Sequence, residues 1–192
     1  MIAGPNGAGK TTLAFAFIKE HKGMYEEFLN ADEIARGLSP MRPESVNNEA
    51  GKLMIKRFHA CLNENKSFIF ESTGSGLMYA KHLENAKQTG YEVNLLFLWL
   101  LNHDQAVSRV AQRVKQGGHN IPKDDIIRRY YRGLNNLITR YLPISDTALI
   151  LDNSEPESGV RKEIARKERD ARLIVEDKEI WERIHRDANV KI

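Results

Sequence analysis

Short apolar runs alternate with longer amphipathic stretches along this chain. The short runs have the length and composition of β-strands: one ends near Asn30, and the others cover residues 67–73, 92–101 and 147–152. The run at 92–101, EVNLLFLWLL, is almost continuously apolar, which is typical of a strand buried on both faces of a parallel sheet. We therefore expect a mainly parallel sheet at the core.

The amphipathic stretches have apolar residues at the three- and four-residue spacing of helices. Strands that alternate with helices in this way predict repeated βαβ units, and so an α/β fold of three layers, α/β/α, with ligands at the carboxyl ends of the strands. A short helical turn is expected after Asp32. The longer helices are expected at residues 11–22, 47–65, 77–90, 104–116 and 123–142.

Residues 155–192 are expected to form a small C-terminal appendage. Their loose alternation at 161–177 predicts a hairpin, and the pattern at 178–187 predicts a short helix. The chain of 192 residues is long enough for one hydrophobic core, so we expect a single domain over residues 1–192.

The chain contains no apolar run long enough to span a bilayer, and no signal-peptide pattern at its start. We expect a cytoplasmic protein without a membrane partner. The formal net charge is +3, and Lys and Arg are interspersed with Asp and Glu. This distribution argues against a nucleic-acid partner and suits a ligand with several phosphates. Cys61, the one cysteine, is expected to be a buried apolar residue.

Residues 4–11 fit the phosphate-loop pattern G-x-x-x-x-G-K-[ST] at every fixed position. The glycines allow positive φ angles and a close approach of backbone N–H groups to phosphate oxygens, and the following helix presents its N-terminus to the anion. Lys10 is predicted to contact the β- and γ-phosphates, and the Thr11 hydroxyl to bind Mg²⁺. The expected nucleotide-binding residues are Gly4, Pro5, Asn6, Gly7, Ala8, Gly9, Lys10, Thr11 and Thr12.

Only three residues, 1–3, precede this loop, whereas the strand before a phosphate loop needs about five. A start site placed too late, a truncated chain or a shortened strand would each produce this arrangement, and we favour the first two. An N-terminally extended version is expected to be the more stable protein.

Two carboxylates are predicted at other strand ends. Asp32 follows the second strand, where it could accept the proton of an attacking hydroxyl or help to hold Mg²⁺; the alternative is an N-cap of the next helix. Glu71 ends the strand FIF, and the hydroxyls of Ser72, Thr73 and Ser75 follow it. This polar group could bind a polyhydroxy substrate or a water on Mg²⁺; the alternative is an ordinary polar strand exit.

The helices at 104–142 carry arginines on one face and are joined by the linker GGHNIP. We expect them to form a mobile lid that brings guanidinium groups onto the transferring phosphate, although solvated helix faces would give the same pattern. Arg113 and Arg129 are the expected catalytic arginines. His119 of the linker, with Arg128 and Arg132, is expected to bind the substrate; for His119 the alternative is a simple loop residue.

The motifs GPNGAGKTT, FLNADEIARGLSP, FIFESTGSG, RVKQGGHNIPKDDIIRRY and LILDNS together resemble the zeta toxin family of phosphate-loop kinases, particularly its stand-alone bacterial branch. The resemblance runs in order from the first residues to about Ser154. It implies a kinase that uses ATP or GTP to phosphorylate the 3′-hydroxyl of UDP-N-acetylglucosamine. It also implies that an inhibitory antitoxin would be a separate protein.

The same resemblance implies roles for single residues. Lys10 and Thr11 match the nucleotide and Mg²⁺ residues, Asp32 matches the catalytic base, and Glu71 and Thr73 match positions that bind the amino-sugar. Stand-alone members commonly read Glu-Thr-Thr-Leu-Ser-Gly where this chain reads ESTGSG. The alternative functions are another metabolite kinase with the same parts, or a regulatory nucleotide-binding ATPase module.

Overall fold

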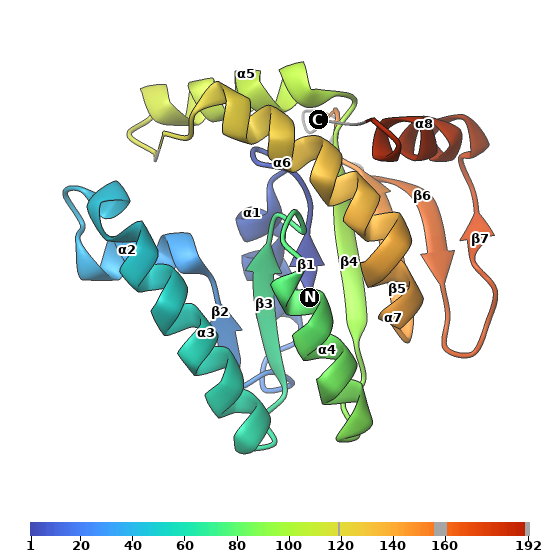
Figure 1. The fold of residues 1–192 in the computed structure, drawn as a ribbon, viewed down its shortest axis with the longest axis horizontal. Coiled ribbons are helices and arrows are strands. Elements are labelled where there is room, and N and C mark those ends of the chain that lie inside the picture. Colours follow the sequence, from blue (N-terminus) through green and yellow to red (C-terminus); the bar gives the residue numbers. More distant parts are fainter. Residues whose placement is uncertain (119, 156–160, 191–192) are drawn as a thin grey trace.

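A computed structural model describes residues 1–118, 120–155 and 161–190, and it confirms the three-layer α/β fold (Figure 1). Within the described residues a seven-stranded sheet has the order β2-β3-β1-β4-β5-β6-β7. The strands are β1 (Ile2–Ala3), β2 (Glu27–Leu29), β3 (Phe68–Ser72), β4 (Asn94–Trp99), β5 (Thr147–Asp152), β6 (Lys162–Lys167) and β7 (Ile174–Val175).

Strands β1 to β5 are parallel, so their carboxyl ends lie along one edge of the sheet. Strand β6 pairs antiparallel with β5, and β7 pairs antiparallel with β6, so β6 and β7 form the predicted hairpin. The helices are α1 (Lys10–Glu20), α2 (Ala31–Leu38), η1 (Pro43–Val46), α3 (Asn47–Asn63), α4 (Met78–Gln88), α5 (His103–Lys115), α6 (Lys123–Asn136), η2 (Leu137–Tyr141), α7 (Leu142–Ile144) and α8 (Lys178–Ala188).

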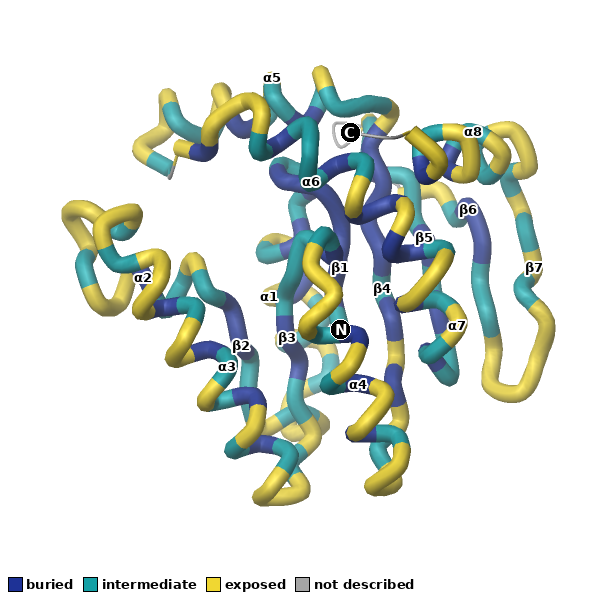
Figure 2. Tube along the Cα trace, viewed as in Figure 1, coloured by how far each residue is buried: buried dark blue, intermediate teal, exposed yellow. Residues whose placement is uncertain are grey.

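Successive residues of the central strands pack on opposite faces of the sheet, as the two-residue period of a strand requires. Ile2 and Ile69 form a small apolar cluster with Ala14 of α1, which lies behind the sheet in Figure 1. Phe70 and its neighbours belong to the main core, together with Phe58 of α3 in front of the sheet. The buried positions accordingly follow the central strands and the inner sides of the helices (Figure 2).

The predicted helix at 123–142 is interrupted by the π-helical segment η2 (Leu137–Tyr141). In an α-helix, residues five apart point about 140° away from each other, whereas a π-helical turn brings them close to one face. Here Asn136 donates from Nδ2 to the carbonyl of Gly74 (2.9 Å), and the Tyr141 hydroxyl donates to the carbonyl of Gly76 (2.5 Å). The wide turn therefore lets both side chains hold the loop that follows β3.

The prediction for Cys61 is also confirmed. Cys61 is fully buried in the main core, and burial raises the pKa of its thiol. Helix α8 packs on α6 and β6, so the described part of the C-terminal appendage is joined to the core. None of the helices in the described part of the chain is long and apolar enough to cross a membrane.

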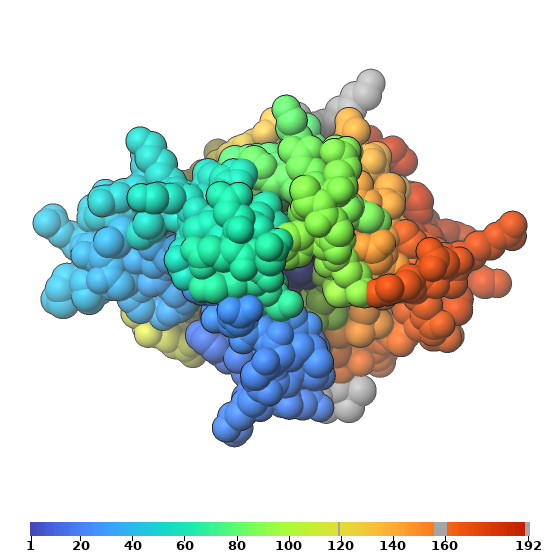
Figure 3. Space-filling view, turned by 90° about the horizontal axis from the view of Figure 1, so that it is seen from below, coloured from blue at the N-terminus to red at the C-terminus, as the bar shows by residue number. Residues whose placement is uncertain are grey.

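Strand β1 occupies only part of its position in the sheet. Ile2 and Ala3 pair with Glu71–Ser72 of β3 and with Leu96–Phe97 of β4. Beyond them the two flanking strands continue, and an apolar cavity of about 850 Å³ opens between β3 and β4. Figure 3 shows it as a hollow with dark blue atoms from the start of the chain at its base. Its walls include Met1, Phe17, Phe58, Phe70, Leu83 and Leu95.

Filling this cavity should stabilise the protein. We predict that four β-branched residues fused ahead of Met1 raise the melting temperature by roughly 5–10 °C, because each buried apolar side chain contributes about 1.5–3 kcal/mol. A Gly-Ser extension of equal length is the control, and both proteins can be compared by calorimetry. Equal melting temperatures for the apolar and the Gly-Ser extensions would contradict the prediction.

Candidate active site

A cleft of about 860 Å³ lies at the carboxyl edge of the parallel strands. The phosphate loop forms one wall, and the first turns of α2 and α3 together with the loop after β3 form another. Helices α5 and α6 contribute arginines from above. The cleft therefore brings together segments from residue 6 to residue 129 of the chain.

The phosphate loop has the backbone that its glycines predict. Gly4, Gly7 and Gly9 have φ angles of 143°, 78° and 80°, which favour residues without a Cβ. A Cβ at Gly4 would lie 2.3 Å from the carbonyl oxygen of Leu98, so the loop passes directly against β4. Asn153, at the end of β5, donates from Nδ2 to the carbonyl of Ala8 (2.8 Å) and holds the loop from the other side.

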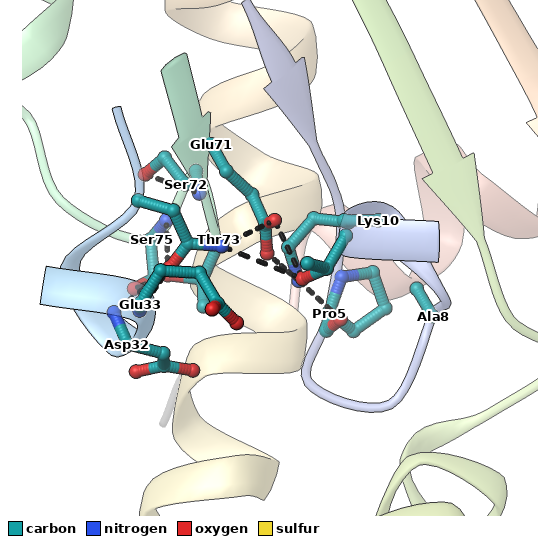
Figure 4. A network of polar contacts seen from close by, with 12 residues as sticks. Pro5, Ala8, Lys10, Asp32, Glu33, Glu71, Ser72, Thr73 and Ser75 are labelled. Carbon is teal, nitrogen blue, oxygen red and sulfur yellow. Dashed lines mark hydrogen bonds and ion pairs between the residues drawn. The ribbon is translucent and has the colours of Figure 1, made fainter. Parts of the chain in front are cut away.

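Lys10, Thr11 and Glu71 form a compact polar cluster in the lining of the cleft. Figure 4 shows the side chains of Lys10 and Glu71 close together. The Thr11 hydroxyl donates to Oε2 of Glu71 (2.7 Å), and Nζ of Lys10 lies 3.8 Å from Oε1 of the same carboxylate. Nζ of Lys10 also donates to the carbonyl of Pro5 (3.0 Å). The cluster thus joins the start of α1 to the end of β3.

Burial lowers the pKa of Lys10, because desolvation disfavours its charged form. The negative charges of Glu71 and Asp32 oppose this shift. Lys10 is only 7% exposed, so it is a cation held in a partly desolvated site. Such a cation interacts strongly with an incoming phosphate.

Asp32 lies in the first turn of α2, but it does not cap that helix. The cap is Asn30, whose Oδ1 accepts from the backbone N–H groups of Asp32 (2.8 Å) and Glu33 (3.3 Å). Within the described residues, the Asp32 carboxylate has no hydrogen bond or ion pair, and Figure 4 shows it clear of the network around Glu71. Asp32 also lines the cleft. The alternative role as a helix cap is therefore filled by Asn30.

The loop after β3 is ordered by its own hydroxyls and by α6. Thr73 and Ser75 share a hydrogen bond between their hydroxyl oxygens (2.8 Å), and both line the cleft. Gly133 of α6 lies so close to this loop that a Cβ there would be 2.9 Å from the carbonyl oxygen of Thr73. Because glycine has no side chain, α6 can pack directly against this loop at Gly133.

The arginines of α5 and α6 divide into two sets. Arg113 and Arg129 line the cleft, as does Arg109, whose guanidinium donates to the carbonyl of Ser154 (2.8 Å). Arg128 forms an ion pair with Asp125 along the same helix and is absent from the cleft lining. Arg132 is exposed and also absent from it. Arg113 and Arg129, predicted to be catalytic, therefore lie at the cleft, whereas Arg128 and Arg132, predicted to bind the substrate, do not.

His119 lies outside the described residues. The segment around it connects α5 and α6, and Asn120 and Ile121 next to it line the cleft. Among the described residues, no group of three or more His, Cys, Asp or Glu side chains could hold a metal ion. Mg²⁺ at a nucleotide usually keeps water and phosphate oxygens among its ligands and takes few from the protein.

Sequence reasoning overlooked Asn30 and Asn153. Each amide follows a predicted strand, in the motifs FLNAD and LILDNS, and each is now seen to be buried and to hold the site in shape. Position at a strand end was the available signal, but it did not reveal that the two side chains point inward. Glu44 and Asn47, at the start of the helical segment after α2, also line the cleft and were not assigned.

We predict that Gly133→Ala destabilises the protein by about 1–3 kcal/mol, because the new methyl group would press on the Thr73 carbonyl. Gly51→Ala in α3 is the matched control, since no atom lies within 4 Å of a Cβ there. That change should stabilise the protein by up to about 1 kcal/mol through helix propensity. Urea unfolding of both variants tests the pair; equal stabilisation by both would contradict the contact.

Comparison with known proteins identifies relatives of this chain. The family model for Zeta toxin matches residues 1–155. An uncharacterised protein of Haemophilus influenzae is 31% identical over 127 residues, which are 66% of this chain and 88% of that protein.

Solved structures show the same fold at lower identity. The crystal structure of AvrRxo1-ORF1:-ORF2 with ATP superposes with a TM-score of 0.73 and 19% identity, covering 100% of this chain but only 64% of that one. The PezAT toxin-antitoxin system of Streptococcus pneumoniae superposes with a TM-score of 0.63 and 18% identity, covering 98% of this chain and 84% of that one. With this fold and the family match over residues 1–155, the chain belongs to the Zeta toxin family.

Proposed function

We propose that this protein is a kinase that transfers the γ-phosphoryl group of ATP to a hydroxyl of a small molecule, with UDP-N-acetylglucosamine or a related sugar nucleotide as the acceptor. One observation carries the proposal: the carboxylate of Asp32, which has no hydrogen bond or ion pair among the described residues, lines the same cleft as the phosphate loop and Lys10. Such a carboxylate can take the proton of an attacking hydroxyl.

In the proposed reaction the acceptor oxygen forms a bond to the γ-phosphorus, and the bond from that phosphorus to the β–γ bridging oxygen breaks. The acceptor proton passes to Asp32, and ADP leaves. Lys10 and backbone N–H groups of the loop would stabilise negative charge on the phosphates, and Arg113 and Arg129, which line the same cleft, would do so from α5 and α6. GTP would make the same contacts, because the proposed contacts are all with the phosphate groups.

Thr11 and Glu71 are the residues that would hold Mg²⁺, Thr11 through its hydroxyl and Glu71 directly or through water. Their oxygens are 2.7 Å apart beside the phosphate loop, and hard oxygen donors of this kind suit the ion. When bound, Mg²⁺ supplies positive charge to the β- and γ-phosphates. This proposal gives Glu71 a role next to the phosphates in place of the predicted contact with the amino-sugar.

The acceptor side of the cleft is lined by amides, hydroxyls and carboxylates from Asn47, Asn48, Thr73, Ser75 and Glu44. Groups of this type form hydrogen bonds with a hydroxyl-rich acceptor such as a sugar. The choice of UDP-N-acetylglucosamine rests on the family, while the neutral and acidic lining supports the broader class. A different hydroxyl-bearing metabolite would meet the same lining.

Only part of the proposed lid at 104–142 would move to close the cleft. Its later half is fixed, because Tyr130 donates to the carbonyl of Leu100 (3.0 Å) and Asn136 donates to that of Gly74 (2.9 Å). The end of α5, with Arg113, and the first turn of α6 would move toward bound ATP, whereas Arg129 lies directly before Tyr130 and would stay in place. We limit the proposed motion to these two helix ends.

The direct test is incubation of the protein with Mg-ATP and UDP-N-acetylglucosamine, followed by mass spectrometry for a product heavier by one phosphoryl group. ADP formed only with an acceptor supports the kinase. ADP formed equally without any acceptor would support an ATPase module instead, and turnover only with a different alcohol would support another metabolite kinase.

Asp32→Asn should lower kcat by about 10²–10⁴-fold while leaving the Kd for ATP almost unchanged, because the amide cannot accept the proton. Glu33→Gln is the matched control, since the neighbouring Glu33 pairs with Arg36 on the same helix. Rapid-quench kinetics and calorimetry give the two quantities. Full activity in Asp32→Asn would remove this residue from the role of base.

Lys10→Ala should weaken ATP binding by about 10-fold or more, because a buried cation at the phosphates is lost. Lys19→Ala, at the exposed end of α1, should bind ATP as the unchanged protein does. Fluorescence titration with an ATP analogue measures both. Unchanged affinity in Lys10→Ala would argue against the loop as the nucleotide site.

The proposal includes a separate antitoxin protein as a partner. It is supported by the family and by the PezAT toxin-antitoxin system among the structural neighbours. Growth arrest on expression of the protein, absent for Asp32→Asn, would support a toxic kinase. Normal growth at high expression would favour a housekeeping role.

A further inference from the structure

We propose that Asn30 is a positioning residue that locks the helix bearing Asp32 to the Thr11–Glu71 pair of the phosphate site. The inference deepens the proposed kinase function and rests on it. It starts from a buried amide that the reaction itself does not use: Asn30 is 5% exposed and lies between β2 and α2.

Both ends of the Asn30 side chain are engaged. Its Oδ1 accepts from the backbone N–H groups of Asp32 and Glu33, and its Nδ2 donates to Oε2 of Glu71 (2.8 Å) and, more weakly, to Oγ1 of Thr11 (3.4 Å). This orientation is required chemically, because an ionised carboxylate can only accept and a backbone N–H can only donate. Asparagine alone among the good helix caps offers an oxygen and an N–H donor together.

The amide joins parts of the sheet that are not neighbours. Strand β2, which leads into Asn30, lies at the edge of the described sheet and pairs with β3, while the phosphate loop follows β1 on the other side of β3. The Asn30 side chain thus reaches past the end of β3 to Thr11. It is the direct polar link between the turn that carries the candidate base and the candidate Mg²⁺ residues.

This link fixes two things at once. Glu71 receives hydrogen bonds from Thr11 and Asn30 on the same oxygen, so its carboxylate is oriented beside Lys10. Asp32 is held at a set place relative to the phosphates through the backbone of its own turn. Hydrogen bonds from residues behind a site's ligands commonly tune metal affinity or activity by 10–100-fold.

The capping role and the positioning role can be separated. Asn30→Ser keeps an N-cap oxygen but loses the amide donor to Glu71, and Asn30→Asp keeps the cap but sets a second carboxylate against Glu71. Asn102 offers a matched control, because its Oδ1 caps α5 through the N–H of Gln105 (2.8 Å) away from the cleft. Asn102→Ser therefore reports the effect of the cap exchange alone.

The experiment measures melting temperature, kcat, and the Kd for ATP with Mg²⁺ and with EDTA. Asn30→Ser should have a melting temperature close to that of Asn102→Ser. Its kcat should nevertheless fall by about 10-fold or more, and so should the factor by which Mg²⁺ tightens ATP binding. Asn30→Asp should lose at least as much in kcat as Asn30→Ser, because its carboxylate cannot donate to Glu71 and repels it. Asn102→Ser should leave all of these quantities unchanged.

The inference is overturned if Asn30→Ser matches Asn102→Ser in kcat and in the Mg²⁺-dependent ATP affinity, or if its losses only follow a lowered melting temperature. Failure of the proposed function looks different. In that case the unchanged protein transfers no phosphoryl group to any acceptor, and the Mg²⁺ dependence of ATP binding in Asn30→Ser still decides the role of Asn30.

Discussion

The arrangement of the cleft depends on two contacts of the Glu71 carboxylate, its hydrogen bond from Thr11 and its ion pair with Lys10. These contacts tie the end of β3 to the start of α1, and Asn30 extends the connection to α2. Charged groups in such a desolvated place must be paired, because a buried unpaired charge costs several kcal/mol. The pairing holds the phosphate loop, the base turn and the loop after β3 at fixed separations.

A second constraint is the close approach of backbones around the cleft. Gly4 lies against the carbonyl of Leu98, and Gly133 lies against that of Thr73. Both contacts exclude a side chain, so the loop before α1 and the helix above the cleft each rest directly on neighbouring backbone. The π-helical turn η2 completes this arrangement, because it directs Asn136 and Tyr141 to the same loop. Polar contacts and close packing therefore position the same short segments.

The parallel sheet explains why one edge carries all of these groups. Strand ends that are far apart in sequence lie side by side there, so short polar motifs after β1, β2, β3 and β5 meet in space. Strand β1 is central to this edge although it contains only Ile2 and Ala3. Its pairing with β3 and β4 suffices to place the phosphate loop, while the cavity behind it leaves part of the apolar core open.

The alternation of strands and helices, the phosphate loop, and the candidate residues Lys10, Thr11, Asp32 and Glu71 could all be predicted from the amino-acid sequence. These follow from periodicity and from a motif whose residues are contiguous, so local chemistry is enough to predict them. The tertiary structure was needed to show which acceptor each donor contacts. Asn30 caps α2 in place of Asp32, Glu71 accepts a hydrogen bond from Thr11 at the phosphate loop, and Arg128 forms an ion pair with Asp125. Such choices depend on the rotation of each helix and the register of each strand, which are set by packing across the whole core.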